Sequence, residues 1–267
     1  MRRIAWVIAA LIVVAAVVWF GQRRLIYFPD RGEPGPAGDS LARGSDVQLR
    51  PADGLTLTAW RVIPSGESRD WAVLYLPGNG GNRAWRAPVA RVLAEQGFTV
   101  LLVDYRGYGG NPGSPSEEGL VRDAQAAQEY LAQSGFAAER TIYVGESIGT
   151  GVAAHLAERV PPAGLLLRSP YASLGAVASH TVGGLPIGWA IRDRFDTLGR
   201  MPAIDAPVTV LAGGADETIP PAQSRAVADA APNLFAFHER PGVGHNDALW
   251  FGPYLAQQVS DLADHAG

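Results

Sequence analysis

Short apolar runs alternate with helix-like segments along most of this chain, and that alternation limits the folds open to it. The runs are almost continuously apolar, which is typical of strands buried on both faces of a parallel sheet. We expect such strands over residues 71–76, 98–103, 141–144, 164–167, 207–211 and 234–239. We expect helices between them, over residues 83–96, 115–133, 148–159, 222–231 and 247–263. An antiparallel strand pair over 47–49 and 55–62 precedes them. The pattern predicts one doubly wound α/β domain, with a mainly parallel central sheet covered by helices on both faces.

The amino-terminal end is different, because residues 4–20 form one unbroken apolar run. As a helix this run is about 25 Å long, at the short end of what crosses a bilayer. A cleaved signal peptide is the main alternative, but the run ends in the bulky Trp19 and Phe20 where signal peptidase requires small residues. A buried core helix is a third interpretation. We therefore expect an uncleaved single-pass membrane anchor.

The domain organisation follows from this anchor. We expect residues 1–24 to form the anchor, residues 25–45 a tether, and residues 46–267 the α/β domain, with a short cap at about 170–201. The tether expectation rests on its Gly, Pro and Asp content and its lack of periodicity. Arginines flank the run on both sides, so the positive-inside bias nearly cancels. The hypothesis is that the amino terminus lies inside and the domain on the extracytoplasmic side.

Composition excludes several classes of function. The chain has no cysteine, which removes thiol nucleophiles, thiolate metal sites and disulfides. Its five histidines are far apart and show no paired metal-ligand spacing, so we expect neither a metal nor a cofactor. The net charge is −4 and the acidic excess is spread along the chain, which argues against nucleic acid as a partner.

One motif within the predicted α/β domain indicates a catalytic residue. It is the sequence Gly-Glu-Ser-Ile-Gly at residues 145–149. It follows the expected strand 141–144 and opens the expected helix 148–159, which is the strand–turn–helix context of a nucleophile elbow. The turn is so sharp that larger side chains at positions 145 and 149 would collide, which explains why both positions are glycine. The alternative is a glycine-rich turn with an incidental serine. We expect Ser147 to be the nucleophile of a serine hydrolase with an α/β-hydrolase fold.

A serine hydroxyl needs a base, and in this fold the acid and then the histidine follow the serine along the chain. His245 lies in a glycine-rich loop after the last strand, whereas His238 lies inside that strand and His265 in the polar tail. His155, on the helix after Ser147, suits packing or the surface. Asp216 lies in the loop leaving the expected strand 207–211, with Glu217 as the runner-up. Asp193, Asp196 and Asp205 precede that strand and are expected to be solvated or to cap helices, and Asp247 to cap the last helix.

The oxyanion of such a reaction requires two main-chain donors. The loop Pro-Gly-Asn-Gly-Gly-Asn at residues 77–82 leaves the first central strand and lets the main chain approach a substrate oxygen. We expect one donor to be the N–H of Asn79, with Gly80 as the alternative. The other is expected to be the N–H of Ile148, directly after the nucleophile.

Several motifs together resemble the BEM46-like (ABHD13/ABHD17-type) α/β hydrolases. They are Leu-Ile-Tyr-Phe-Pro at 25–29, the loop at 77–82, Asp-Tyr-Arg-Gly-Tyr-Gly at 104–109, Gly-Ser-Pro-Ser-Glu at 113–117, the motif at 145–149, Ser-Pro-Tyr at 169–171 and Gly-His-Asn-Asp at 244–247. The resemblance implies a membrane-tethered serine hydrolase acting on ester, thioester or lipid-like substrates through Ser147, Asp216 and His245. Two positions depart from the family pattern: Pro77 stands where the family has His, and residues 216–220 are a close variant of Asp-x-x-Val-Pro.

Three functions remain open at the level of sequence. The first is cleavage of a small-molecule or lipid-like acyl ester or thioester by an esterase, thioesterase or lipase. The second is amide or peptide hydrolysis by the same residues, since acyl-transfer chemistry does not fix the leaving group. The third is a catalytically inactive membrane-anchored binding module, against which the intact Ser147, Asp216 and His245 argue. The apolar residues of the cap could line a substrate cleft or simply cover the sheet.

Overall fold

The computed structural model describes residue 6, residue 19 and residues 21–267. The expected anchor at residues 4–20 therefore lies outside the described residues, except for Trp6 and Trp19. Among the residues that are described, no helix is both long and apolar enough to cross a membrane.

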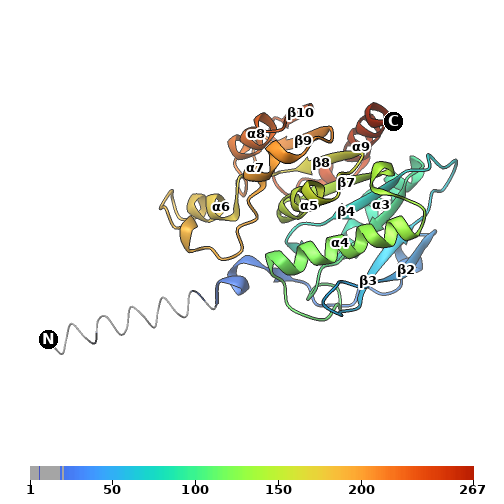
Figure 1. Cartoon of the computed structure of the whole chain (residues 1–267), viewed down its shortest axis with the longest axis horizontal. Helices are drawn as coiled ribbons and strands as arrows, with labels where there is room; N and C mark the ends of the chain where they lie inside the picture. Colours follow the sequence, from blue (N-terminus) through green and yellow to red (C-terminus); the bar gives the residue numbers. More distant parts are fainter. Residues whose placement is uncertain (1–5, 7–18, 20) are drawn as a thin grey trace.

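The described elements alternate as the sequence predicts (Figure 1). The strands are β1 (Phe28–Pro29), β2 (Gly44–Leu49), β3 (Leu57–Val62), β4 (Ala72–Leu76), β5 (Gly80–Gly81), β6 (Thr99–Leu102), β7 (Thr141–Glu146), β8 (Gly164–Arg168), β9 (Val208–Gly213) and β10 (Leu234–Arg240). The α-helices are α2 (Ala37–Ser40), α3 (Ala87–Glu95), α4 (Glu117–Gln133), α5 (Ile148–Arg159), α6 (Leu174–Thr181), α7 (Thr197–Arg200), α8 (Pro221–Asp229) and α9 (Pro253–Ala266). Short 3-10 helices are η1 (Arg83–Arg86), η2 (Ala138–Arg140), η3 (Gly188–Ala190), η4 (Met201–Ala203) and η5 (Ala248–Phe251).

Eight strands form one sheet in the order β10-β9-β8-β7-β4-β6-β3-β2. Neighbours from β10 to β6 are parallel, and β3 and β2 add an antiparallel edge. The predicted mainly parallel sheet and the antiparallel pair before it are confirmed. Every residue of β4, β7, β8 and β9 is buried, which explains why these strands have continuous apolar runs rather than an alternating pattern.

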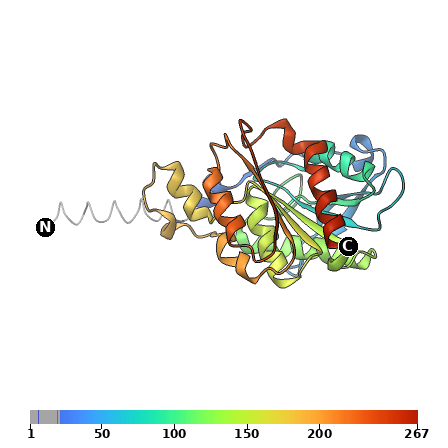
Figure 2. The same cartoon turned by 90° about the horizontal axis from the view of Figure 1, so that it is seen from above.

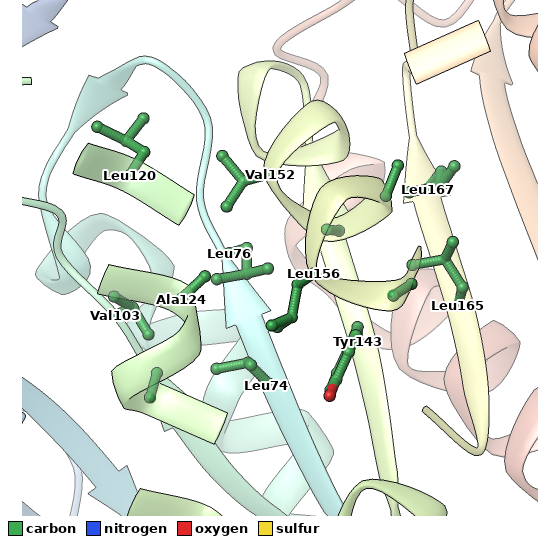
Figure 3. Close-up of a cluster of buried hydrophobic side chains, with 14 of the residues drawn as sticks. Leu74, Leu76, Val103, Leu120, Ala124, Tyr143, Val152, Leu156, Leu165 and Leu167 are labelled. Atoms are coloured by element: carbon green, nitrogen blue, oxygen red, sulfur yellow. The ribbon is translucent and has the colours of Figure 1, made fainter. Parts of the chain in front are cut away.

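Helices cover both faces of the sheet, as Figure 2 shows from above. One core cluster joins α4, α5 and α8 to one face, and a second cluster joins α3 and α9 to the other. Figure 3 shows the first cluster, where α4 and α5 lie over the central strands. Its labelled side chains are Leu74, Leu76, Val103, Leu120, Ala124, Tyr143, Val152, Leu156, Leu165 and Leu167. The helix α5, which follows the expected nucleophile, is therefore fixed by packing along its whole length.

Three helices differ in detail from the prediction. The expected helix 83–96 begins as η1, and the α-helix starts only at Ala87, where Pro88 occupies its first turn. The expected helix 115–133 begins at Glu117, because Ser116 is its N-cap and accepts a hydrogen bond from Gly119 N at 3.1 Å. The expected helix 247–263 is divided into η5 and α9 at Gly252. Asp247 caps η5, so its expected capping role is confirmed.

The segment expected as a tether lies along the body of the domain. Tyr27, Ala37 and Leu41 are buried, and residues 37–40 form α2. Strand β1 pairs in parallel with β5, which brings the chain just after the expected anchor beside the glycine-rich loop. The segment expected as a cap contains α6, η3 and α7 and follows β8.

Candidate active site

Ser147 lies at the sharp turn between β7 and α5, where the sequence predicts the nucleophile. Its φ of 51° and ψ of −118° are a strained conformation for a residue with a side chain. Its N–H donates to Arg168 O at 2.9 Å and its carbonyl accepts from Thr150 N at 2.9 Å. Ser147 is partly exposed between buried neighbours, so its hydroxyl can be reached by a substrate.

The two glycines of the motif are required by close packing. A Cβ on Gly145 would lie 2.7 Å from Thr150 Cα, inside the turn itself. A Cβ on Gly149 would lie 2.2 Å from Leu76 O and 2.6 Å from Pro77 O, at the base of the glycine-rich loop. Backbone atoms cannot move aside as a flexible side chain can. The Gly-x-Ser-x-Gly pattern is therefore the steric condition for packing the turn against that loop.

His245 is the histidine that the fold brings to Ser147. Its Nε2 lies 3.0 Å from Ser147 Oγ, and its Nδ1 lies 2.7 Å from Asp216 Oδ2. A neutral imidazole with its proton on Nδ1 would donate to the carboxylate and accept from the hydroxyl. This arrangement lets His245 take the proton of Ser147 while Asp216 holds the ring and balances the charge that develops.

The carboxylate of Asp216 is held by more than the histidine. Its Oδ1 accepts from the N–H groups of Thr218 at 2.9 Å and Ile219 at 2.8 Å. Its Oδ2 also accepts from Ser169 Oγ at 2.9 Å. Burial raises the pKa of Asp216, but the hydrogen bonds from His245, Ile219 and Ser169 outweigh it and hold the pKa below its usual value. Asp216 therefore stays ionised beside His245.

Ser169 is a functional candidate that the sequence analysis quoted within the family motif at 169–171 but gave no role. It follows β8, is fully buried, and has a φ of 50°. Like Ser147, Ser169 is a non-glycine residue with positive φ at the end of a strand. This strained backbone marks Ser169 as a candidate, and it can be seen only in the structure.

The remaining candidates lie elsewhere. His265 stacks on Phe235 with ring centroids 4.3 Å apart, and Glu217 is exposed beside Asp216. Asp196 caps α7 by accepting from Gly199 N at 3.0 Å, as expected. Asp193 was expected to be solvated or to cap a helix, and this is wrong: it is buried and accepts hydrogen bonds from Arg23 and Tyr27.

His155 and His238 also lie away from Ser147 Oγ. His155 is partly buried on α5, and burial, together with the nearby Arg200, lowers its pKa to about 4. His238 lies on the edge strand β10, where it pairs with Leu211 of β9. His245 is therefore the one histidine that shares a hydrogen bond with Ser147 among the residues that the structure describes.

The two residues expected to supply the oxyanion donors lie on the two segments that meet at the elbow. Ile148 is the first residue of α5, so its N–H has no acceptor within the helix. Asn79 lies in the loop between β4 and β5, and its side chain fastens that loop. Asn79 Oδ1 accepts from Tyr108 Oη at 2.9 Å and from Phe28 N at 3.3 Å, and Nδ2 donates to Ile26 O. The sequence analysis considered only the main chain of Asn79.

Behind the site, a buried ion-pair network connects the turn that carries Ser147 to the glycine-rich loop at residues 77–82. Glu146, next to Ser147, lies 2.7 Å from Arg86 Nη2 and 2.9 Å from Arg168 Nη2 and accepts from Tyr75 Oη at 2.9 Å. Arg86 donates to Gly80 O in the glycine-rich loop, at 2.6 Å. Burial favours the neutral acid, but the two arginines outweigh it and lower the pKa of Glu146 to about 2.

Comparison with known proteins places the chain in a family. The family model for the alpha/beta hydrolase fold matches residues 72–170. An uncharacterized protein of Mycobacterium tuberculosis is 44% identical over 235 residues, which cover 88% of this chain and 84% of that protein. Protein bem46 of Schizosaccharomyces pombe is 34% identical over 234 residues, which cover 82% of this chain and 76% of bem46. The chain belongs to the BEM46-like α/β hydrolase family. The resemblance seen in its motifs is therefore confirmed.

Two further comparisons bear on this BEM46-like hydrolase. Lysophosphatidylserine lipase ABHD12 of Mus musculus is 29% identical over 280 residues, which cover 86% of this chain and 69% of ABHD12. The crystal structure of Pyrococcus furiosus esterase Pf2001 superposes with a TM-score of 0.71 at 20% identity, covering 89% of this chain and 99% of the esterase. At that identity the superposition shows the α/β-hydrolase fold and no more.

Proposed function

We propose that this BEM46-like protein is a serine hydrolase that cleaves carboxylic ester or thioester bonds through Ser147, His245 and Asp216. The observation that carries the proposal is the continuous hydrogen-bonded chain from Ser147 Oγ through the imidazole of His245 to Asp216 Oδ2. Each of the three residues leaves the carboxyl end of a different strand, so their proximity requires the folded sheet. Similarity to a lysophosphatidylserine lipase favours an ester or thioester over an amide.

The reaction proceeds through an acyl-enzyme. Ser147 Oγ attacks the carbonyl carbon while His245 Nε2 takes the hydroxyl proton, and negative charge develops on the carbonyl oxygen. The N–H groups of Asn79 and Ile148 are the proposed donors to this oxyanion. Collapse breaks the bond to the alcohol or thiol, which leaves with the proton from His245. Water then attacks the acyl-enzyme, with His245 as base, and the acid departs.

The proposal includes a membrane anchor. Residues 4–20 form an uninterrupted apolar run, and we assign to them a single membrane crossing with the hydrolase domain on the extracytoplasmic side. Protease added to intact cells would cut the domain if this orientation is right. A domain that is cut only after the cells are lysed would exclude that orientation.

A fluorophosphonate probe tests the nucleophile directly. Native protein is expected to be labelled and Ser147→Ala is not. Ser147→Ala and His245→Ala are each expected to lower kcat by about 10⁴-fold or more with the fold intact, and Asp216→Asn by a comparable or smaller factor. A native protein that is not labelled would favour the inactive binding module, and full activity in either alanine variant would overturn the assignment.

A substrate panel tests the leaving group. Short- and long-chain p-nitrophenyl esters, their thioester counterparts and aminoacyl anilides are compared at equal concentration. Esters or thioesters are expected to turn over faster, and faster cleavage of the anilides would favour the amide hydrolase instead.

A further inference from the structure

The cap contains a segment whose composition does not suit a surface in contact with water. Residues 172–191 contain no Asp, Glu, Lys or Arg, although 18% of the chain is charged. None of these residues is buried, and the whole of α6 lacks a buried residue. Leu174 and Val177 are partly buried and pack against the core. The rest of the segment lies outside the core, and the segment has none of the charged side chains that normally cover a surface in water.

Three large apolar side chains of this segment are exposed. Val182 is 41% exposed, Leu185 61% and Trp189 82%. The two arms of the segment meet through glycines, since a Cβ on Gly175 would lie 3.0 Å from Gly188 Cα. Because the contact between the arms uses their smallest residues, the larger ones are left on the outside. Exposed apolar side chains gathered in one uncharged segment are typical of a surface that contacts a membrane or another protein.

The end of the segment is fastened to the chain directly after the apolar run. The guanidinium of Arg192 lies 5.4 Å from the ring centroid of Trp19. The N–H of Arg192 donates to Gln22 Oε1 at 2.8 Å, and Gln22 is buried. The cap therefore touches the last residues of the apolar run and the first residues beyond it.

A second attachment lies one residue further along the cap. Arg23 donates to both carboxylate oxygens of Asp193 at 2.9 Å, and Tyr27 Oη donates to Asp193 Oδ2 at 3.0 Å. Figures 1 and 2 both show α6 at the same end of the molecule as the described start of the chain. These contacts fix the position of the cap relative to the residues that directly follow the apolar run at 4–20.

We propose that residues 172–191 rest on the lipid bilayer that holds residues 4–20, so that the cap is a membrane-contact surface. The proposal depends on the anchor proposed above. If the run crosses a bilayer, Trp19 lies at its interface, and a cap in contact with residues 19–23 lies there too. Leu185 and Trp189 are side chains suited to that interface. The exposed Arg192 and Arg194 directly follow the segment and would meet anionic lipid headgroups.

This placement identifies the source of the substrate. The segment leaves β8 just after Ser169, which binds Asp216, and Tyr171, whose hydroxyl donates to Ile148 O at 3.3 Å. The proposed membrane-contact segment therefore begins next to the residues that contact Asp216 and Ile148. The substrate class is the acyl ester of a membrane lipid, which reaches the site from the bilayer without crossing water.

Single-site labelling of the full-length chain tests the contact. The protein has no cysteine, so one introduced cysteine carries an environment-sensitive dye without background. Leu185→Cys and Trp189→Cys report on the cap. Ala137→Cys and Gln257→Cys are controls, because both residues are exposed and neither belongs to the cap. Ala137 lies before β7, and Gln257 lies on α9. Each variant is reconstituted in phosphatidylcholine vesicles that contain a minority of phosphatidylglycerol.

The expected result is that the two cap labels emit at shorter wavelength and are quenched about twofold or more by nitroxide lipids, while the controls do neither. Vesicle flotation of the same samples reports on the anchor separately. Protein that floats with unquenched cap labels overturns the cap contact and leaves the anchor standing. Protein that does not float overturns the anchor and the cap contact together. A spectral shift without lipid quenching indicates a protein neighbour, which also overturns the proposal.

Hydrolysis gives a second measurement. In Leu185→Ser and Trp189→Ser, the rate on a vesicle-borne lysophospholipid divided by the rate on a water-soluble ester is expected to fall about tenfold. Leu234→Ser is the matched control, an exposed leucine at the amino end of β10, whereas the cap follows the carboxyl end of the parallel strand β8. An unchanged ratio in both cap variants would overturn the proposal, and the fluorophosphonate reaction of Ser147 tests the hydrolase itself independently.

Discussion

Arg168 donates a hydrogen bond from Nη1 to the carbonyl oxygen of His245, at 2.9 Å, from a fully buried position at the end of β8. Its Nη2 lies 2.9 Å from Glu146, the residue before Ser147. One guanidinium therefore connects the backbone of His245, the proposed base, to the turn that carries Ser147, the proposed nucleophile. Because catalysis depends on the relative position of Ser147 and His245, we assign Arg168 the role of a positioning residue.

Arg168→Met is expected to lower kcat about tenfold and to change KM less, since the imidazole would lose its fixed distance to Ser147 Oγ. It also leaves Glu146 with one arginine fewer, and breaking a buried pair costs about 3–5 kcal/mol of stability. Steady-state kinetics and thermal melts measure the two effects. Arg168→Lys keeps the charge and should recover part of both.

Arg106→Met is the matched control for that loss of stability. Arg106 pairs with the fully buried Asp123 at 2.6 Å and has no contact with Ser147, Asp216 or His245. We expect it to lower the melting temperature and to leave kcat of the folded protein near the native value. Equal losses of kcat in the two variants would assign Arg168 a purely structural role.

Ser169→Ala removes one of the hydrogen bonds that hold Asp216 in place and keep its carboxylate ionised. Hydrogen bonds to charged acceptors contribute about 1.5 kcal/mol or more, so we expect kcat/KM to fall about tenfold. Because that bond helps to lower the pKa of Asp216, the acidic limb of the pH–rate profile is expected to move to higher pH.

Ser224→Ala controls for the loss of a buried serine hydroxyl. Ser224 is equally buried, and its Oγ donates to Pro170 O at 2.8 Å rather than to the carboxylate. Its pH–rate profile should match that of the native protein. If Ser169→Ala has the same profile as well, the hydroxyl has no part in orienting Asp216.

The site could be derived from the sequence to the extent that it consists of local motifs. Residues 145–149 specify a strand–turn–helix by themselves, and the glycine-rich loop before His245 follows a strand in the same way. Asp193 could not be placed correctly, because its partners Arg23 and Tyr27 lie 170 and 166 residues away. Nothing in the sequence around Asp193 indicates a pairing over that distance.

The ion-pair network around Glu146 could not be predicted from the sequence either, because its members are far apart along the chain. Glu146, Arg86 and Arg168 come from β7, η1 and β8. They converge only because β7 pairs with β8 on one side and with β4 on the other, and the glycine-rich loop after β4 leads into η1. In the sequence Glu146 and Arg168 each stand at the end of an apolar run, which is equally typical of a solvated strand end, and Arg86 lies in an expected helix, where it could equally face water. The strands of the main sheet and the helices α3, α4, α5, α8 and α9, by contrast, followed from apolar periodicity, with errors at their ends, where Pro88, Ser116 and Gly252 decide the first residue. The short elements β1, β5, α2, α6 and α7 were not predicted, because they are too short to show a period.

Glu146 makes the stability depend on pH in a definite direction. Its pKa is about 2 in the folded protein against an ordinary value of 4.5. A lowered pKa means that the ion pairs stabilise the fold above pH 4.5, and that this stability is lost as the pH falls from 4.5 towards 2. Glu146→Gln has no carboxylate to protonate. It should be less stable than native protein at pH 7, and its stability should change less over that interval.

Urea unfolding at pH 6 and at pH 3 measures this effect, with the exposed Glu139→Gln as control. The native protein and the control are expected to lose more stability between the two pH values than Glu146→Gln does. Equal losses in all three proteins would mean that other groups account for the acid sensitivity.

Asn79→Ala is expected to lower kcat about 10- to 100-fold, although the donor proposed at this position is the main-chain N–H. The side chain of Asn79 fastens the loop to Phe28 N, to Ile26 O and to the hydroxyl of Tyr108. Without these three bonds the loop can shift by more than an oxyanion contact tolerates, and losing one such donor costs about 3 kcal/mol. The loss should appear in kcat rather than in KM, because the oxyanion is absent from the bound substrate and forms only in the tetrahedral intermediate and the transition states that flank it.

Two variants separate this effect from a general loss of hydrogen bonds. Tyr108→Phe removes one of the three bonds of Asn79 and should retain most of the activity. Asn111→Ala also removes three bonds of a buried amide, those to Thr58 N, Thr58 O and Asp104 O, but in a turn that does not contact Ser147. We expect it to lower the melting temperature by at least as much as Asn79→Ala and to lower kcat far less. If the three variants lost kcat in proportion to their loss of stability, the loop would contribute to the fold and not to the stabilisation of the oxyanion.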